Sequence, residues 1–140
     1  MIGNVRFFSV LLLAKHLRTY LNPGPKSSLT LTSGGVAEKP VPNWSTVASY
    51  AGGLHSMTRN LALDLKPIRV NLVSPGAVDT ELWNGMSKEQ KERMFKGIEA
   101  SLLTGRVGKP EDLAEQYLTL LRDYNVTGSV VRSDGGHALV

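Results

Sequence analysis

Two long stretches of the chain carry apolar residues at helical spacing. Asn4 to Leu21 is apolar on most sides, which is typical of a helix that packs on two sides, and it stops at Asn22-Pro23-Gly24-Pro25. Trp44 to Lys66 has small or apolar residues every three to four positions, and Pro67 closes it. We expect two long packed helices. Glycine weakens a helix, so Gly52-Gly53 in the second predicts the close approach of another helix backbone.

Three short segments have the composition of β-strands. Ser28 to Thr32 is rich in β-forming residues and ends at Ser33-Gly34-Gly35, which predicts a strand followed by a turn. Ile68 to Val73 is mostly Ile, Val and Leu, as in strands buried on both faces, and Ser74-Pro75-Gly76 is expected to break it. Ser129 to Arg132 is the third predicted strand.

The remaining segments predict a lid and a further helix. Thr80 to Ala100 is charged and amphipathic, and its apolar side consists of Met86, Met94, Phe95 and Ile98. The next helix is expected to begin at Lys109-Pro110-Glu111-Asp112, where proline and two carboxylates suit a first turn. Strands separated by helices predict an α/β fold with a parallel sheet covered on both faces.

Composition narrows the class of protein. The 140 residues are 41% apolar and 20% charged, which predicts one globular domain over residues 1–140. The chain has no cysteine, which favours an intracellular, cytoplasmic protein. The longest apolar run, Phe7 to Ala14, is too short to cross a bilayer, so we expect no membrane partner.

Charge and histidine content indicate neither nucleic acid nor metal as a partner. The net charge is +4, but acidic residues are interspersed among the basic ones along the chain, so no nucleic acid is expected. His16, His55 and His137 lack the spacing of metal ligands, so no metal site is expected either.

Four stretches, in this order, resemble the C-terminal half of the short-chain dehydrogenase/reductase family. They are Leu29 to Ser33, Arg69 to Thr80, Gly105 to Ala114 and Thr127 to Gly136. The resemblance covers nearly the whole chain, and its second and third stretches are specific. It implies the C-terminal, substrate-side half of a Rossmann-type doubly wound sheet, with about three parallel strands, flanking helices and no nucleotide-binding half.

The resemblance implies only part of a cofactor site. Pro75 and Gly76 lie where a doubly wound sheet binds its ligand, and in the family Val78 would pack on the nicotinamide ring while Thr80 bonds its carboxamide. An ordinary strand-to-helix turn explains the same residues. The sequence lacks the Gly-rich turn that holds the dinucleotide phosphates, so no cofactor is expected, or NADP if the protein is a reductase.

The family's catalytic positions are altered. Asn4 falls on the catalytic Asn and Ser33 on the Ser, but Thr46 and Tyr50 stand where Tyr and Lys belong. A threonine hydroxyl does not ionise near neutral pH, and Tyr50 supplies no positive charge, so standard hydride transfer is not supported. Two alternatives stay open for Tyr50: a pair with Ser33 around a substrate carbonyl, or a core tyrosine.

Three functions remain. The first is an enzyme that keeps a pocket formed by Ser33, Trp44, Tyr50 and the lid, and that performs proton transfer, isomerisation or cyclisation of a small apolar metabolite without NAD(P). The second is a non-catalytic, truncated pseudoenzyme that forms a homo-oligomer through helices 4–21 and 44–66, as the family does. The third is an NAD(P)-dependent oxidoreductase whose N-terminal half is missing from this chain.

Overall fold

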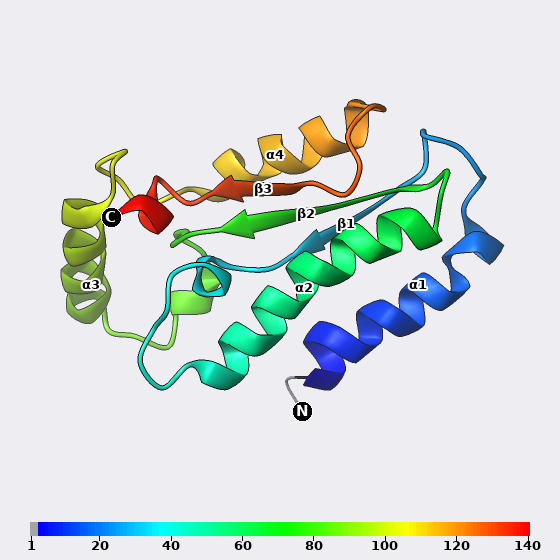
Figure 1. Cartoon of the computed structure of the whole chain (residues 1–140). Helices are drawn as coiled ribbons and strands as arrows, with labels where there is room; N and C mark the ends of the chain where they lie inside the picture. The colour runs from blue at the N-terminus through cyan, green and yellow to red at the C-terminus, as the bar shows by residue number, and fades with distance from the viewer. Residues whose placement is uncertain (1–2) are drawn as a thin grey trace.

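The computed structural model describes residues 3–140, which form a three-stranded parallel sheet between two helical layers (Figure 1). The strand order is β1-β2-β3, with both neighbouring pairs parallel, so the predicted α/β fold and parallel sheet are confirmed. α1 and α2 cover one face and α4 covers the other. The strands are β1 (Ser28–Thr32), β2 (Arg69–Pro75) and β3 (Val130–Ser133), and the helices are α1 (Ser9–Tyr20), α2 (Ser45–Asp64), α3 (Lys88–Ser101) and α4 (Pro110–Arg122).

The element boundaries differ from the sequence-based expectation in two places. The first helix opens with a π-helical turn, η1 (Asn4–Phe8), before α1 begins. β2 continues through Ser74 and Pro75, where a break was predicted. The backbone N–H groups of β2 point alternately to the β1 side and to the β3 side. The N–H of Arg69 donates to the Ser27 carbonyl before β1, and the N–H of Gly76, just after β2, donates to the Ser133 carbonyl of β3. The donor that Pro75 lacks would therefore point past the end of β1, so the proline costs the sheet no hydrogen bond.

One apolar core lies between the sheet and the α1–α2 layer. Leu29 and Leu31 of β1 and Val70 and Leu72 of β2 point to this face, because alternate residues of a strand share a side. They pack against buried side chains of both helices and the following loop, namely Ala14, Leu17, Leu54, Met57, Leu61, Leu65 and Ile68. The outer edge of β1 pairs with no strand in residues 3–140, and the buried Thr30 hydroxyl has no partner there.

The first helix leaves much apolar surface uncovered. Exposed side chains on several sides of η1 and α1 are Val5, Phe8, Leu11, Leu12, Leu13 and Tyr20. The helix backbone expected close to Gly52-Gly53 is not what lies nearest: a Cβ on Gly53 would lie 2.7 Å from the side-chain ring of Phe7, and a Cβ on Gly52 would meet nothing within 4 Å among residues 3–140. Within the described residues, the helices fall short of the length and apolar character needed to cross a membrane.

Arg69, the first residue of β2, joins four parts of the chain although it is buried. Its guanidinium donates to the carbonyls of Leu120 (2.6 Å), Leu121 (3.1 Å) and Val126 (3.2 Å), at and beyond the end of α4. A further bond reaches Pro25, in the loop before β1, at 2.6 Å. A helix C-terminus carries partial negative charge and unpaired carbonyls, so it is a suitable partner for this buried cation.

We predict that Arg69→Met lowers the free energy of unfolding by about 3 kcal/mol or more, because it leaves buried carbonyls without donors. Urea unfolding followed by circular dichroism measures the change. Arg93→Met is the matched control, since Arg93 is exposed on α3 and should change stability by less than about 0.5 kcal/mol. Equal stability of the two variants would contradict this role of Arg69.

Candidate functional site

The loops that follow the three strands converge at the carboxyl end of the sheet, where open α/β sheets bind ligands (Figure 1). The loops lie in contact at Gly35, and at Gly76 they lie so close that only glycine fits without a shift. A Cβ on Gly35 would lie 3.5 Å from the His137 ring and 3.8 Å from the Pro75 carbonyl oxygen. A Cβ on Gly76 would lie 2.7 Å from the Cα of Asp134. The loop after β2 is thus enclosed between the loops after β1 and β3.

Ser33 and Tyr50 are not brought together. The half-buried Ser33 hydroxyl donates to the Ala51 carbonyl of α2 at 3.0 Å. Tyr50 turns towards the first helix instead: its ring centroid is 5.8 Å from that of Phe7, and a Cβ on Gly3 would lie 2.5 Å from its hydroxyl. The structure thus places Tyr50 as a packing residue between α2 and η1.

Asn4 and Thr46 both lie on the surface. Asn4 is exposed in η1, and its carbonyl accepts the Ser9 backbone N–H. Thr46 is exposed in the first turn of α2. Of the four candidate catalytic residues, Ser33 directly follows β1 and bonds to α2, and a catalytic role for any of the four stays a prediction.

The loop after β2 holds the predicted nicotinamide contacts in internal bonds. Val78 is buried and forms a bridge to Gly108: Asp79 donates to the Gly108 carbonyl at 2.9 Å, and Gly108 donates to Ala77 at 3.0 Å. The Thr80 hydroxyl accepts the Leu82 N–H at 3.3 Å and caps the turn η3 (Glu81–Trp83). Both residues therefore also have a structural role in this turn.

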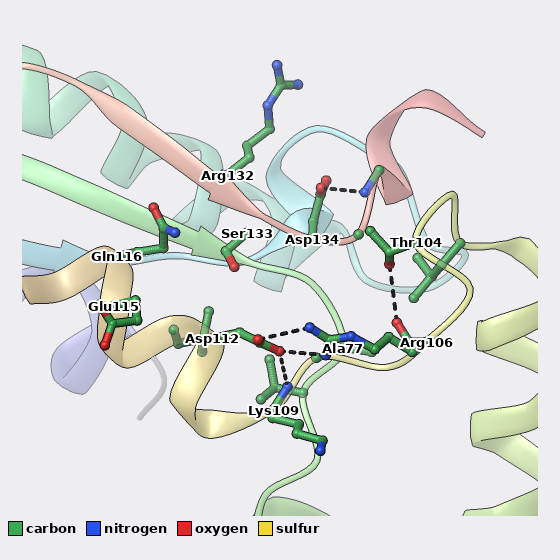
Figure 2. A pocket seen from close by; sticks show the side chains of 16 residues that line it. Ala77, Thr104, Arg106, Lys109, Asp112, Glu115, Gln116, Arg132, Ser133 and Asp134 are labelled. Atoms are coloured by element: carbon green, nitrogen blue, oxygen red, sulfur yellow. Dashed lines mark hydrogen bonds and ion pairs between the residues drawn. The ribbon is translucent and has the colours of Figure 1, made fainter. Parts of the chain in front are cut away.

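A cleft of about 470 Å³ opens between the first turns of α4 and the loops after β2 and β3 (Figure 2). Its apolar lining comes from Ala77, Val78, Leu102 and Leu113, and its polar lining includes Gln116 and Ser133. The sequence predicted a pocket at Ser33, Trp44, Tyr50 and the lid. None of those three residues lines this cleft, which lies elsewhere, and the predicted pocket stays a prediction. Val78 is the predicted residue that lines this cleft.

An ion pair fixes the rim of the cleft. The Asp112 carboxylate accepts two bonds from the Arg106 guanidinium, at 2.6 and 2.9 Å, and one from the Lys109 backbone N–H at 2.8 Å (Figure 2). These bonds, the Arg106 side chain first, lower the pKa of Asp112 to about 2. Asp112 was expected as a first-turn carboxylate, whereas its partner Arg106 was not expected, because a spacing of six residues is no standard helical pair.

A second cluster of charged side chains, around Glu38, attaches the segment after β1 to the sheet. Arg132 of β3 donates to Glu38 at 3.2 Å, and the Nδ1 of His55 on α2 is 3.9 Å from the same carboxylate. Burial lowers the pKa of His55, and the neighbouring Glu38 opposes that effect. The segment that carries Gly35 is thus held from both sides.

This fold and this site define a class of protein: the substrate-side half of a Rossmann-type doubly wound domain. A family model for SDR-like Rossmann domains matches residues 1–140. The chain belongs to the short-chain dehydrogenase/reductase (SDR) family.

Known proteins of the family match the chain closely. The short-chain dehydrogenase/reductase MalC of Malbranchea aurantiaca is 41% identical over 138 residues, which are 99% of this chain and 52% of MalC. The 3-oxoacyl-[acyl-carrier-protein] reductase FabG of Chlamydia muridarum is 34% identical over 101 residues, 69% of this chain and 39% of FabG. This chain therefore spans about half the length of the first of these relatives and less of the second.

Solved structures extend the similarity to the backbone. The structure of MalC, described as a Reductase/Diels-Alderase, superposes with a TM-score of 0.95 and covers 99% of this chain and 54% of that one. A small-chain dehydrogenase in complex with NADPH is 36% identical, with a TM-score of 0.92, over 99% of this chain and 62% of that one. The predicted half of a Rossmann-type sheet is thus confirmed.

The residues present do not fit a whole nicotinamide dinucleotide. Its phosphates require the N-terminus of a helix that follows a Gly-rich turn. In residues 3–140 each strand is followed by a single 3-10 turn, namely η2 (Gly35–Ala37), η3 and η4 (His137–Leu139). Tyr50, at the position of the family's lysine, places its hydroxyl over Gly3. The nicotinamide contacts expected at Val78 and Thr80 stay a prediction.

Two glycine substitutions test the crowding at the junction. Gly76→Ala should lower the free energy of unfolding by about 1–3 kcal/mol, because its Cβ would overlap the Asp134 backbone. Gly52→Ala should raise it by about 0.5–1 kcal/mol, since the new methyl group meets no atom within 4 Å and favours the helix. Thermal unfolding of both variants measures these changes. An unchanged stability of Gly76→Ala would mean that the loops are not tightly packed.

Proposed function

We propose that the chain binds a small apolar molecule at the carboxyl end of its sheet and promotes a redox-neutral change in it: proton transfer, isomerisation or cyclisation, without NAD(P). The observation that carries this proposal is a retained substrate side combined with an altered catalytic helix. The converging loops and the cleft are present, while Thr46 is exposed and Tyr50 packs on Phe7. We place this activity in the cytoplasm, in keeping with the absence of cysteine.

A relative's description supports the cyclising form of this activity. MalC is described as a Reductase/Diels-Alderase, and its structure matches 99% of this chain. A cycloaddition joins two parts of a substrate without adding or removing hydride, so it requires neither a redox cofactor nor an ionised phenol. Holding the reacting atoms in contact supplies much of the rate enhancement in such a reaction.

The physical character of the site agrees with shelter and orientation of a substrate. Val78 and Leu102 are buried and Leu113 is half-buried, which gives the cleft an apolar wall. Among the six charged residues that line it, Arg106 pairs with Asp112, and Arg132 pairs with Glu38 outside the cleft. A volume of about 470 Å³ is within the range of small-molecule sites.

We predict that the purified chain converts an apolar substrate into a product of unchanged mass without NADPH. A panel of small dienes and unsaturated ketones, followed by mass spectrometry with and without NADPH, makes the measurement. A ligand that binds the folded state raises its melting temperature. Because we expect no binding of NADPH or NADP⁺, neither should change the melting temperature of the chain. A product heavier by one hydride and one proton, formed only with NADPH, would establish the reductase alternative instead.

Exposed apolar residues favour a second candidate, a non-catalytic protein that acts through self-association. Leu12 and Val5 are 62% and 67% exposed on one side of the first helix, and Phe8 lies beside them. Their burial against a second copy, through helices 4–21 and 44–66, would remove this surface from water. Homo-oligomer formation is compatible with the first function as well.

Sedimentation velocity tests this association. The chain should sediment as a dimer or larger species, and Leu12→Glu should shift it to the monomer, because a charge in an apolar interface is costly. Leu82→Glu is the matched control, since Leu82 is 79% exposed in η3, away from α1 and α2. A monomeric parent chain at micromolar concentration would exclude this second candidate.

A further inference from the structure

α3 lies apart from the two helical layers, beyond the carboxyl end of the sheet (Figure 1). None of its residues is fully buried, so its packing against the rest of the protein is limited. The helix itself is well formed, because Ser87 and Gln90 make a reciprocal capping box at its start. α3 is thus a stable helix with little attachment, as the predicted lid requires.

Both ends of this lid are anchored. Before α3, the Trp83 indole N–H donates to the Val78 carbonyl at 2.7 Å, which fixes η3 to the loop after β2. After α3, Leu102 is buried, and Thr104 donates to the Gly135 carbonyl at 3.3 Å. The lid is therefore a strap that is held at two points on the carboxyl-end junction.

Between the anchors, one set of contacts holds the first half of α3 in place. The Lys91 ammonium is 2.6 Å from the Asp79 carboxylate, which directly follows Val78. The same ammonium lies over the Phe95 ring, 5.3 Å from its centroid, and Phe95 meets the edge of Trp83 at 6.0 Å. In the last turns, Glu99 accepts the Val107 N–H at 3.5 Å.

We propose that the Asp79–Lys91 ion pair is a salt-sensitive latch for the strap. When it is closed, α3 lies against the loop after β2; when it opens, the first half of α3 swings away while Trp83 and Leu102 stay fixed. Gly85, where an added Cβ would meet no other part of residues 3–140 within 4 Å, provides the flexible joint before the helix. This inference concerns access to the carboxyl end and stands whether or not the proposed chemistry does.

The exposure of the pair explains why it can act as a latch. The side chains of Lys91 and Asp79 are 29% and 51% exposed, so water and salt reach the pair. Half-exposed ion pairs are weak enough to open thermally, and salt screens them further. The other charges near the pair, Lys88, Glu92, Lys96 and Glu99, line the same shallow hollow and balance in sign.

Hydrogen exchange of the α3 amides, measured by mass spectrometry, tests the latch. Lys91→Met keeps the length of the side chain and removes its charge. Without the pair, the first half of α3 loses support from the loop after β2 and unfolds transiently more often. Exchange in the peptide that covers residues 84–98 should therefore be about two- to fivefold faster, the factor that a pair of this strength implies. Lys88→Met is the matched control: among the described residues, Lys88 pairs at 4.0 Å only with Glu92 of the same helix, so exchange should be unchanged.

Two further readouts keep the result decisive. Added salt should speed exchange in the parent chain but not in Lys91→Met, and Asp79→Asn should match Lys91→Met in both respects. Circular dichroism should show unchanged helix content, which separates opening of the strap from loss of the helix. Equal exchange in Lys91→Met and Lys88→Met, or salt dependence that survives in Lys91→Met, would overturn the latch.

Discussion

A buried cation without a carboxylate partner organises this fold. Arg69 is 3% exposed, its side-chain hydrogen bonds go to backbone carbonyls, and its guanidinium lies over the Tyr124 ring, 5.8 Å from the centroid. Asn71, two residues along the same face of β2, donates to Val126 at 2.8 Å and accepts from Ser129 at 3.1 Å. Together these two side chains attach the end of α4 and the start of β3 to the central strand. The α4 layer is thus held by polar contacts, whereas the α1–α2 layer is held by the apolar core.

The position of the cleft follows from that attachment. Arg69 fixes the C-terminal end of α4, so the other end of the helix projects towards the carboxyl end of the sheet. There Asp112 joins the helix to Arg106, and Gly76 lets the loop after β2 meet Asp134. A rigid helix with both ends fixed, and loops in van der Waals contact, give a preformed hollow. Preformed sites lose less conformational entropy when a ligand binds.

Local patterns predicted the elements of this fold well. Apolar periodicity located both long helices, and β-branched residues located all three strands within about two residues. The extension of β2 through Pro75 was not predicted. Whether a strand tolerates a proline depends on whether the N–H that proline lacks would face a neighbouring strand, and this is a property of the whole sheet and not of the segment. Arg69 gave no signal either, since a basic residue at a strand start is ordinarily a surface residue.

The site was harder to predict than the fold. Ser33 and the loop from Pro75 to Thr80 were placed correctly at the carboxyl end, because motif spacing fixes their order along parallel strands. The direction of Tyr50 was not predictable from its place one turn after Thr46. It depends on a gap above Gly3 and on the Phe7 ring, both contributed by a helix more than forty residues earlier in the chain.

That arrangement has a consequence for protein engineering. To rebuild hydride-transfer chemistry on this scaffold, a designer would exchange Thr46 and Tyr50 for the family's Tyr and Lys. The ring of Tyr50 now fills the space between Phe7 and Gly3. A lysine at position 50 would remove that ring and place a charged side chain next to the apolar Phe7. Reversion of two positions on α2 is therefore insufficient, and η1 must be redesigned with them.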